Sequence, residues 1–412
     1  MTDEPPGEPL RRNRDFTLFW CGQLVSTLGS RITSIGYPLL VLAETGSGGD
    51  VGAVAFAQGL PFLLWFLPAG ALVDRGDRKR IMLACDVVRL AGLSVLVGAI
   101  AADRLSVPLV AAVAFVEGTA FVFFELSEAA ALPQIVPRRH LASALAGNQA
   151  RVQGADLLGQ PAGGLLFSVG RAVPFVADAA SYLVSFVTLL FVRPAFQGER
   201  APSPGLARLG AEMREGIAWL ARQPVLRAIV VLVAGSNLAF NALTIVLILR
   251  AESLGASPGV IGVMLAFFGA GAIVGSAVAP RLTRRLSLRA VVVGSMWAWA
   301  ASMVALAPLR SALALGAVAG LGAVVGPVFN VAVAAYRYAA TPDELQGRAL
   351  SAARAVAWGT IPLGGLAAGL LVESVGAAPA LAVLGGYMVA VAAVASVLPS
   401  LRRAAEPHLV AR

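Results

Sequence analysis

Long apolar runs separated by short polar segments make up most of the sequence. Each run is about 20 residues long, the length of a helix that crosses the hydrocarbon core of a bilayer. The runs in the first half are Phe16–Leu42, Val51–Val73, Ile81–Ala102, Val107–Leu132, Leu145–Val169 and Val173–Val192. Those in the second half are Val225–Leu249, Val260–Ala279, Leu288–Ala307, Ala312–Ala335, Leu350–Val372 and Ala377–Leu398. The pattern predicts twelve transmembrane helices, six in each half.

The composition indicates a protein that lies in lipid. Hydrophobic residues make up 58% of the chain and charged residues 13%, and the mean hydropathy is +0.79. A soluble domain carries about a quarter charged residues, so a water-soluble globule is excluded. The lipid bilayer is therefore the expected surrounding of the twelve helices.

The positive charges fall mainly in alternate loops. Short loops rich in Arg and Lys stay on the cytoplasmic side of a membrane. Even-numbered loops and the chain ends hold most basic residues, whereas the odd-numbered loops hold Arg104, Arg171, Arg250 and Arg310. This distribution predicts a multi-pass protein of the inner (plasma) membrane with both termini in the cytoplasm. Because the net charge of +9 follows the loops, no nucleic-acid partner is expected.

One sizeable polar connector divides the chain into two parts. In it Leu209, Met213, Ile217 and Leu220 recur at helical spacing, which predicts an amphipathic helix on the cytoplasmic membrane face. We expect it to act as a tether between the halves. The predicted organisation is a tail at 1–15, a six-helix half at 16–192, the linker at 193–224, a second six-helix half at 225–398 and a tail at 399–412.

An internal repeat supports this division. A Pro-x-Gly-Gly element occurs in the fifth run, as Pro161, Gly163 and Gly164 preceded by Gly159, and again in the eleventh run. The second copy consists of Pro362, Gly364 and Gly365. Small residues at such spacing let helices approach closely, so these positions are expected to be packing contacts between helices. The repeat predicts two similar six-helix halves.

The loop between the second and third runs carries an ordered motif, Gly70-Ala71-Leu72-Val73-Asp74-Arg75-Gly76-Asp77-Arg78-Lys79-Arg80. Asp74 could bind free amides at a helix N-terminus, while the cations bind lipid phosphate. The motif resembles the loop signature of the major facilitator superfamily, except that Asp77 replaces the second glycine. The resemblance implies that Gly70, Asp74, Arg75 and Arg78 form a latch that closes the cytoplasmic side against the second half. An ordinary positive-inside loop is the alternative.

Further short motifs resemble the exporter branch of that superfamily, which includes macrolide efflux pumps and the enterobactin exporter. They are Gly22-Gln23-Leu24-Val25-Ser26, Thr45-Gly46-Ser47, Asp86 with Arg89, and Pro342-Asp343-Glu344-Leu345-Gln346-Gly347-Arg348. The fifth run also partly resembles the superfamily's antiporter signature. The resemblance implies the major facilitator fold, an all-α membrane protein of twelve helices in two pseudo-symmetric halves. It also implies a central cavity lined by the first, fourth, seventh and tenth spans.

Polar stripes occur on those same spans. They comprise Gln23, Thr27 and Arg31 in the first, Glu117 with the aromatic Phe121 and Phe124 in the fourth, Asn237 and Asn241 in the seventh, and Asn330 in the tenth. A charged side chain inside a membrane faces a cavity or a partner. Arg31 and Glu117 lie at similar depth and could pair. Related exporter sequences often have Asp near Arg31, so this arginine would reverse the charge preference of the cavity.

Two readings of Glu117 remain open, a proton or cation site and a structural ion pair with Arg31. Glu125 and Glu128 approach the cytoplasmic end, where solvated carboxylates are ordinary. Asp86, Arg89, Arg151, Asp156 and Arg354 are expected to form inter-helix ion pairs. Asp178 is too isolated in the sequence to assign.

The sequence lacks the signatures of an enzyme. No phosphate-binding loop ending in Gly-Lys-Ser/Thr and no Gly-x-Ser-x-Gly element is evident, and no cluster of residues has metal-ligand spacing, so no cofactor or metal is expected. The predicted function is a monomeric, proton-coupled exporter of amphiphilic small molecules such as a drug, macrolide, siderophore or secondary metabolite, working by alternating access. A nutrient importer and a membrane sensor without transport are the alternatives.

Overall fold

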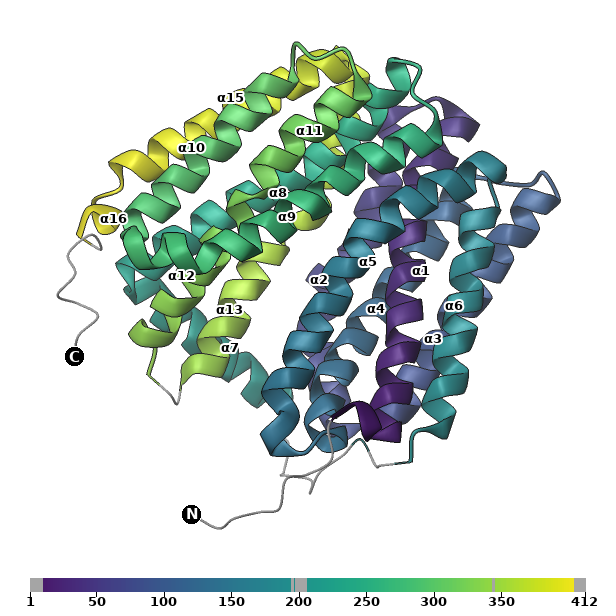
Figure 1. Ribbon diagram of the computed structural model, residues 1–412, viewed down its shortest axis with the longest axis horizontal. Coiled ribbons are helices and arrows are strands. Elements are labelled where there is room, and N and C mark those ends of the chain that lie inside the picture. Colours follow the sequence, from purple (N-terminus) through teal and green to yellow (C-terminus); the bar gives the residue numbers. More distant parts are fainter. Residues whose placement is uncertain (1–9, 194–195, 197–205, 343–344, 404–412) are drawn as a thin grey trace.

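The computed structural model describes residues 10–193, 196, 206–342 and 345–403, and every regular element within them is a helix (Figure 1). The first group of long helices is α1 (Arg14–Thr45), α2 (Gly48–Arg75), α3 (Arg78–Ala101), α4 (Val107–Ile135), α5 (Leu141–Val169) and α6 (Val173–Phe191). Helix α7 (Leu206–Arg222) follows. The second group is α8 (Pro224–Ser253), α9 (Pro258–Arg285), α10 (Leu288–Leu306), α11 (Ala312–Ala323), α12 (Val325–Ala340), α13 (Gln346–Trp358), α14 (Ile361–Val375) and α15 (Ala377–Val397), with the short α16 (Pro399–Arg403).

Side-chain caps and one glycine set several helix ends. Asn13 accepts a hydrogen bond from the Phe16 amide at 3.0 Å and begins α1, and Ser47 accepts one from the Asp50 amide at 3.1 Å and begins α2. These side chains satisfy amides that have no partner within the helix. Gly46 ends α1 with φ of 65°, a left-handed conformation that other residues adopt only with strain.

Length and composition alone identify fewer membrane spans than the twelve predicted. Among the described residues, nine helices or joined helix pairs are long and apolar enough to cross a membrane, and the bent α2 makes ten. Helices α1 and α5 are 32 and 29 residues long, sufficient to cross, but they lie outside this set. Their apolar character is diluted by side chains such as Arg31, Arg151 and Asp156, which find partners inside the protein.

The tenth and eleventh spans are each interrupted by a short turn, but each still counts as one membrane span, Ala312–Ala340 and Ala352–Val375. Pro327 lies just after the break between α11 and α12, and Pro362 just after that between α13 and α14. Proline removes a helical hydrogen bond and clashes with the preceding turn. In lipid the freed backbone groups need partners within the protein, and the Ala357 carbonyl has two. It accepts hydrogen bonds from Asn237 Nδ2 at 2.8 Å and Thr360 Oγ1 at 3.1 Å.

The two groups of helices meet at one end of the molecule and diverge toward the other, where α1 begins and α16 ends (Figure 1). We call these the closed end and the open end; the turn at 45–48 is at the closed end. Contacts between the groups are mainly those of α2 with α14 and of α5 with α9. The largest apolar cluster joins both groups there, and it includes Leu40, Leu247 and Leu249.

The repeated Pro-x-Gly-Gly element has equivalent positions in the two groups. A Cβ placed on Gly163 would lie 2.5 Å from the Ile32 carbonyl oxygen of α1, and one placed on Gly364 would lie 2.5 Å from that of Leu238 in α8. The second glycine of each pair faces the other group. A Cβ on Gly164 would lie 3.0 Å from the Gly262 Cα of α9. The equivalent Gly365 faces α2. One glycine thus allows close packing within a group and the next allows it between groups.

Candidate functional site

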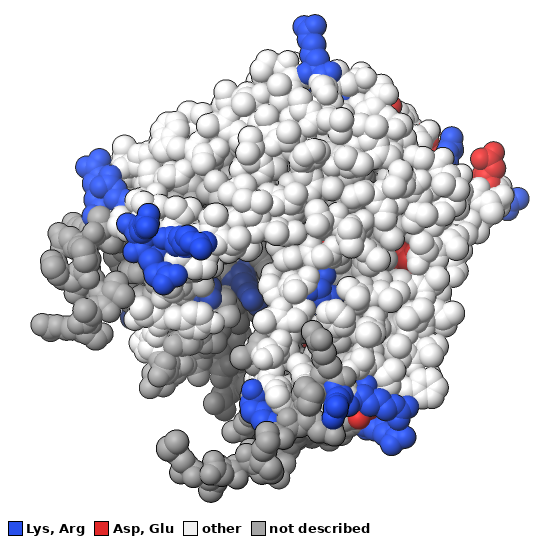
Figure 2. Space-filling model, viewed as in Figure 1, with Lys and Arg blue, Asp and Glu red and all other residues white. Residues whose placement is uncertain are grey.

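A hollow opens between the two groups of helices, and basic side chains lie along its margin (Figure 2). A cavity of about 320 Å³ lies between α5 on one side and α8, α9 and α11 on the other. Its polar lining comes from Gln153, Asp156, Gln160 and Thr244, and its apolar lining from Leu265, Phe268, Gly269, Ala272 and Ala323. A small number of polar groups set in an apolar wall is typical of sites for organic molecules.

Arg31 pairs with Asp156, so the predicted pairing of Arg31 with Glu117 is wrong. The Arg31 Nε lies 2.7 Å from Asp156 Oδ1, and the two side chains are 38% and 28% exposed. Gly159 on α5 permits this contact, because a Cβ there would overlap the Arg31 side chain. The arginine charge is therefore balanced by a carboxylate of α5, and it does not make the cavity positively charged as the sequence suggested.

Glu117 lies inside the first group of helices rather than on the cavity wall. Its side chain accepts hydrogen bonds from the hydroxyls of Tyr37 in α1 and Tyr182 in α6, the latter at 3.3 Å, and the residue is 7% exposed. Arg89 of α3 and Asp178 of α6, both buried, are close enough to act electrostatically on Glu117. The site is therefore an enclosed group of two carboxylates, one guanidinium and two phenols, shared by α1, α3, α4 and α6.

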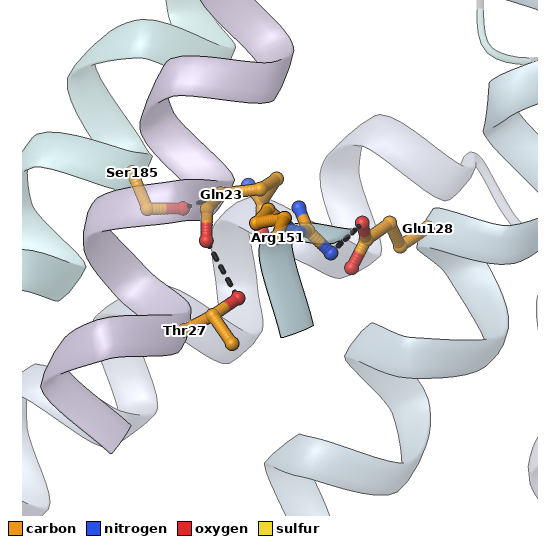
Figure 3. Close-up of polar contacts among 5 residues, drawn as sticks. All are labelled: Gln23, Thr27, Glu128, Arg151 and Ser185. Atoms are coloured by element: carbon orange, nitrogen blue, oxygen red, sulfur yellow. Dashed lines mark hydrogen bonds and ion pairs between the residues drawn. The ribbon is translucent and has the colours of Figure 1, made fainter. Parts of the chain in front are cut away.

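Gln23 is also buried within the first group, at 1% exposure, and does not line the cavity as predicted. Its Nε2 donates to Ser185 Oγ at 3.1 Å, and Ser185 donates to Asp86 Oδ2 at 2.7 Å. Thr27, predicted to line the cavity, is partly buried and donates to the Gln23 carbonyl at 2.6 Å (Figure 3). This chain of contacts connects α1, α6 and α3.

Arg151 and Glu128 form the most buried ion pair among the described residues. Their Nη2 and Oε1 lie 2.6 Å apart, the side chains are 5% and 15% exposed, and they point toward each other between α5 and α4 (Figure 3). The expected inter-helix role of Arg151 and Asp156 is thus observed, with Glu128 and Arg31 as their partners. Glu128 was expected to be solvated; here its charge is instead neutralised inside the protein.

The two predicted aromatic residues of α4 differ in position. Phe121 is 37% exposed, with its ring centroid 5.6 Å from that of Phe62, whereas Phe124 is only 4% exposed and is not on the cavity wall. The Arg89 guanidinium lies 4.9 Å from the centre of the Phe124 ring. Cations bind the faces of aromatic rings, so Phe124 helps to hold Arg89 in its apolar surroundings.

The asparagines of the second group are used partly for structure. Asn237 binds the Ala357 carbonyl at the α13–α14 break, as described above, and Asn241 Nδ2 donates to the Asn237 carbonyl at 2.9 Å. Asn330 of α12 is exposed. None of the three is among the residues that line the 320 Å³ cavity, to which α8 contributes Thr244.

The latch motif lies at the open end, where Asp74 lies near Arg78 and Arg78 contacts α4 and the segment after α6. Asp74 is 59% exposed and 3.9 Å from Arg78, while Arg78 Nη1 donates to the carbonyls of Ala130 and Phe196 at 3.0 and 3.1 Å. The amide-binding role suggested for Asp74 belongs to Asp77, whose side chain caps α3 through the Arg80 amide at 3.1 Å. A Cβ on Gly70 would meet nothing within 4 Å.

The predicted amphipathic helix and the exporter-like motif after α12 lie partly outside the described residues. The expected amphipathic helix is observed as α7, where Leu220 packs with Leu226 and Ala352, but the side chains of Leu209 and Met213 lie outside the described residues. Asp343 and Glu344 of the exporter-like motif are outside them as well. Within the described residues, no group of three His, Cys, Asp or Glu side chains could hold a metal ion.

Sequence reasoning missed several residues of the site. Tyr37 and Tyr182 looked like ordinary apolar positions in their spans, and Asp178 had no partner nearby in the sequence. Gln153 and Gln160 lie in the fifth span, in which only the glycines and the proline were considered as packing positions. The helical spacing of Gln153, Asp156 and Gln160 places them on one face of α5, and this was the signal available.

Comparison with known protein families is consistent with this architecture. The family model described as transmembrane secretion effector matches residues 6–411. Macrolide efflux protein A of Streptococcus pyogenes is 31% identical over 209 residues, covering 50% of this chain and 51% of that protein, so the chain matches about half the length of that relative. The multidrug efflux pump Tap of Mycolicibacterium fortuitum is 26% identical over 397 residues, covering 92% of this chain and 94% of the pump.

Solved structures show the same fold. The crystal structure of nucleoside transporter NupG superposes with a TM-score of 0.75 at 12% identity, covering 93% of this chain and 98% of that one. A bacterial homologue of iron transporter ferroportin in an inward-facing state gives a TM-score of 0.73 at 14% identity, covering 98% and 100%. The predicted all-α fold with two six-helix halves is confirmed.

Proposed function

The chain belongs to the transmembrane secretion effector family of the major facilitator superfamily, and on this basis we propose that it exports amphiphilic organic molecules in exchange for protons. The observation that carries the proposal is the cavity between the two groups of helices, which contact each other through α2 with α14 and α5 with α9. Alternating access needs two halves that can rock around such a site. Glycines at the contacts between the groups let the two halves pack closely at the closed end.

The direction of transport is inferred from the relatives and from the loop charges. Macrolide efflux protein A and the Tap pump are exporters by name. The solved structures, at 12 to 14% identity, indicate the fold and not the direction of transport. With the basic loops in the cytoplasm, the open end faces the cytoplasm, from which an exporter loads its substrate. We propose the boundaries 16–192 and 225–398 for the rocking halves. A single chain encloses the cavity, which supports a monomeric pump.

Glu117 is the proposed coupling site. Its two tyrosine donors come from α1 and α6, so a proton arriving on the carboxylate would compete with hydrogen bonds that connect these helices to α4. Helix α1 also carries Arg31 at the edge of the cavity. A change in the charge of Glu117 would therefore reach the substrate cavity through α1, and this is the connection that a proton-coupled pump needs.

Purified protein in proteoliposomes tests the proposal. An imposed proton gradient is expected to drive uptake of a macrolide or of ethidium into inside-acidic vesicles that contain wild-type protein. Glu117→Gln keeps the size of the side chain and removes the titratable group, so gradient-driven accumulation should be lost while exchange without a gradient persists. Glu44→Gln alters an exposed carboxylate that pairs with Arg171 and should behave like wild type.

Two outcomes would contradict the proposal in different ways. If Glu117→Gln retains gradient-driven transport at the wild-type rate, the role of Glu117 is wrong. If wild-type protein moves none of a panel of antibiotics, dyes and siderophores but transports a nutrient inward, the importer reading replaces the exporter. Ligand binding without any movement would favour a sensor.

A further inference from the structure

The ion pair of Arg31 and Asp156 differs from the other embedded pair in its exposure. Arg151 and Glu128 are 5% and 15% exposed, whereas Arg31 and Asp156 are 38% and 28% exposed. Partners that remain open to solvent are bound weakly, because water competes for both charges. The first pair is therefore suited to holding helices together, and the second is suited to being broken and remade.

Three polar, uncharged side chains, those of Gln153, Gln160 and Thr244, accompany Asp156 in the lining of the cavity. Asp156 and Gln160 line it one helical turn apart on α5, and Gln160 Oε1 is a buried oxygen without a hydrogen-bond partner in the described structure. Thr244 lies on the opposite wall, where its hydroxyl donates to the Phe240 carbonyl at 3.1 Å and keeps its own lone pairs available. Among the residues that line the cavity in the described structure, Asp156 is the one charged side chain, and Arg31 is not part of the lining.

We propose that Asp156 binds a protonated amine of the transported molecule, and that Arg31 occupies the carboxylate when the cavity is empty. The inference rests on the proposed export function and names the class of substrate, an amphiphilic organic cation with N–H donors. The ammonium group would bind Asp156, and the apolar body would contact Leu265, Phe268 and Ala272 across the cavity.

Arg31 has an alternative partner when it leaves Asp156. Glu125 of α4 lies close enough to Arg31 to interact with it electrostatically, and Arg354 of α13 acts on the same carboxylate. Displaced from Asp156, the guanidinium is still attracted by the negative charge of Glu125. The substrate cation then neutralises Asp156 in place of Arg31.

An anionic substrate fits the same geometry less well. Its carboxylate would have to bind Arg31, which is not part of the lining, while Asp156 stays in the cavity as a like charge. Neutral ligands would leave the Arg31–Asp156 pair intact and gain only the apolar wall. The chemistry of the lining therefore favours cations.

Equilibrium binding to the full-length protein in lipid nanodiscs tests this inference without any gradient. The probe is dansylcadaverine, a fluorescent amphiphile with one primary amine, and its N-acetyl derivative is the neutral analogue with the same apolar body. The amine should bind wild-type protein about tenfold or more tightly than the acetylated analogue, since a charge-assisted hydrogen bond is lost on acetylation. Asp156→Asn should weaken binding of the amine to a similar extent and leave binding of the analogue unchanged.

Two further variants separate ligand binding from folding. Asp156→Glu keeps the charge and should retain preference for the amine even if its affinity falls. Arg31→Gln removes the competing cation and should strengthen binding of the amine, which a purely structural ion pair would not do. Glu44→Gln, in the exposed pair with Arg171, is the control and should bind as wild type does.

The inference is overturned if wild-type protein does not prefer the amine, if Asp156→Asn binds it as tightly as wild type, or if Arg31→Gln weakens its binding. These outcomes are distinct from failure of the proposed function. Vesicles that show no transport, together with nanodiscs that show preference for the amine dependent on Asp156, would refute export and support the binding site.

Discussion

The contact of α5 with α9 at the closed end offers a sharp test of how the two halves move. Gly262 of α9 faces backbone atoms of α5: a Cβ at this position would lie 2.6 Å from the Gln160 carbonyl oxygen, 3.0 Å from the Pro161 Cα and 3.2 Å from the Gly164 Cα. Ordinary contacts begin at 3.4 Å. Because the neighbours are backbone atoms on a packed helix, Gly262→Ala can be accommodated only if α5 and α9 separate.

The expected size of the effect follows from the overlap. Adding a methyl group to a well-packed contact costs about 1–3 kcal/mol. Here that cost destabilises only the conformation in which α5 and α9 are in contact. Since about 1.4 kcal/mol corresponds to a tenfold change in an equilibrium constant, Gly262→Ala should raise the population open at this end by roughly fivefold to a hundredfold. The matched control is Gly259→Ala on the same helix, whose added Cβ would meet the flexible end of Leu165 at 3.1 Å.

Spin labels at Thr45 and Ser253, both exposed at the closed end, would report the separation of the halves by pulsed electron resonance. The labels require a background without the native Cys21 and Cys85. A longer-distance component should grow in Gly262→Ala and stay near the wild-type level in Gly259→Ala. Identical distance distributions for Gly262→Ala and wild type, or equal shifts in the two variants, would show that this contact does not control opening.

Two further predictions concern stability, measured by thermal unfolding in detergent. Glu128→Ala leaves the buried Arg151 charge without its partner and should destabilise the protein by about 3–5 kcal/mol, whereas Glu44→Ala, in an exposed pair, should cost about 1 kcal/mol or less; equal losses would contradict the burial argument. Arg78→Ala removes the donor to two backbone carbonyls and should cost about 1–3 kcal/mol, whereas Asp74→Asn, at an exposed position, should stay within about 0.5 kcal/mol. A larger loss for Asp74→Asn would mean that its carboxylate has a structural role in this state.

The membrane fold could be read from the chain because its cause is local. A run of about 20 apolar residues crosses a bilayer wherever it occurs, and proline or glycine interrupts a helix by its own covalent structure. The repeat of Pro161, Gly163 and Gly164 at Pro362, Gly364 and Gly365 likewise needed no coordinates to suggest two similar halves. The breaks at Pro327 and Pro362 could have been predicted on the same ground.

The partners of the embedded charges could not be read in this way. Arg31 and Glu117 lie at similar depth in their spans, and depth alone suggested that they pair. The rotation of α1 decides otherwise, since it places Arg31 against Gly159 and Asp156 of α5 and places Tyr37 against Glu117. The depth of a side chain in the membrane follows from its position along one helix. The direction in which that side chain points relative to its neighbours depends on how several helices pack together.

That the chain crosses a membrane many times in two related halves follows from the amino-acid order alone, because hydropathy and helix-breaking residues act within one segment. Which polar side chains face the cavity and which are enclosed depends on how the helices pack. Gln23, Glu117 and Phe124 are buried inside the first half, while Asp156 and Gln160 of α5 reach the cavity. The physical reason is that a buried charge is stable only beside a partner, and in this bundle those partners come from segments far apart in the chain.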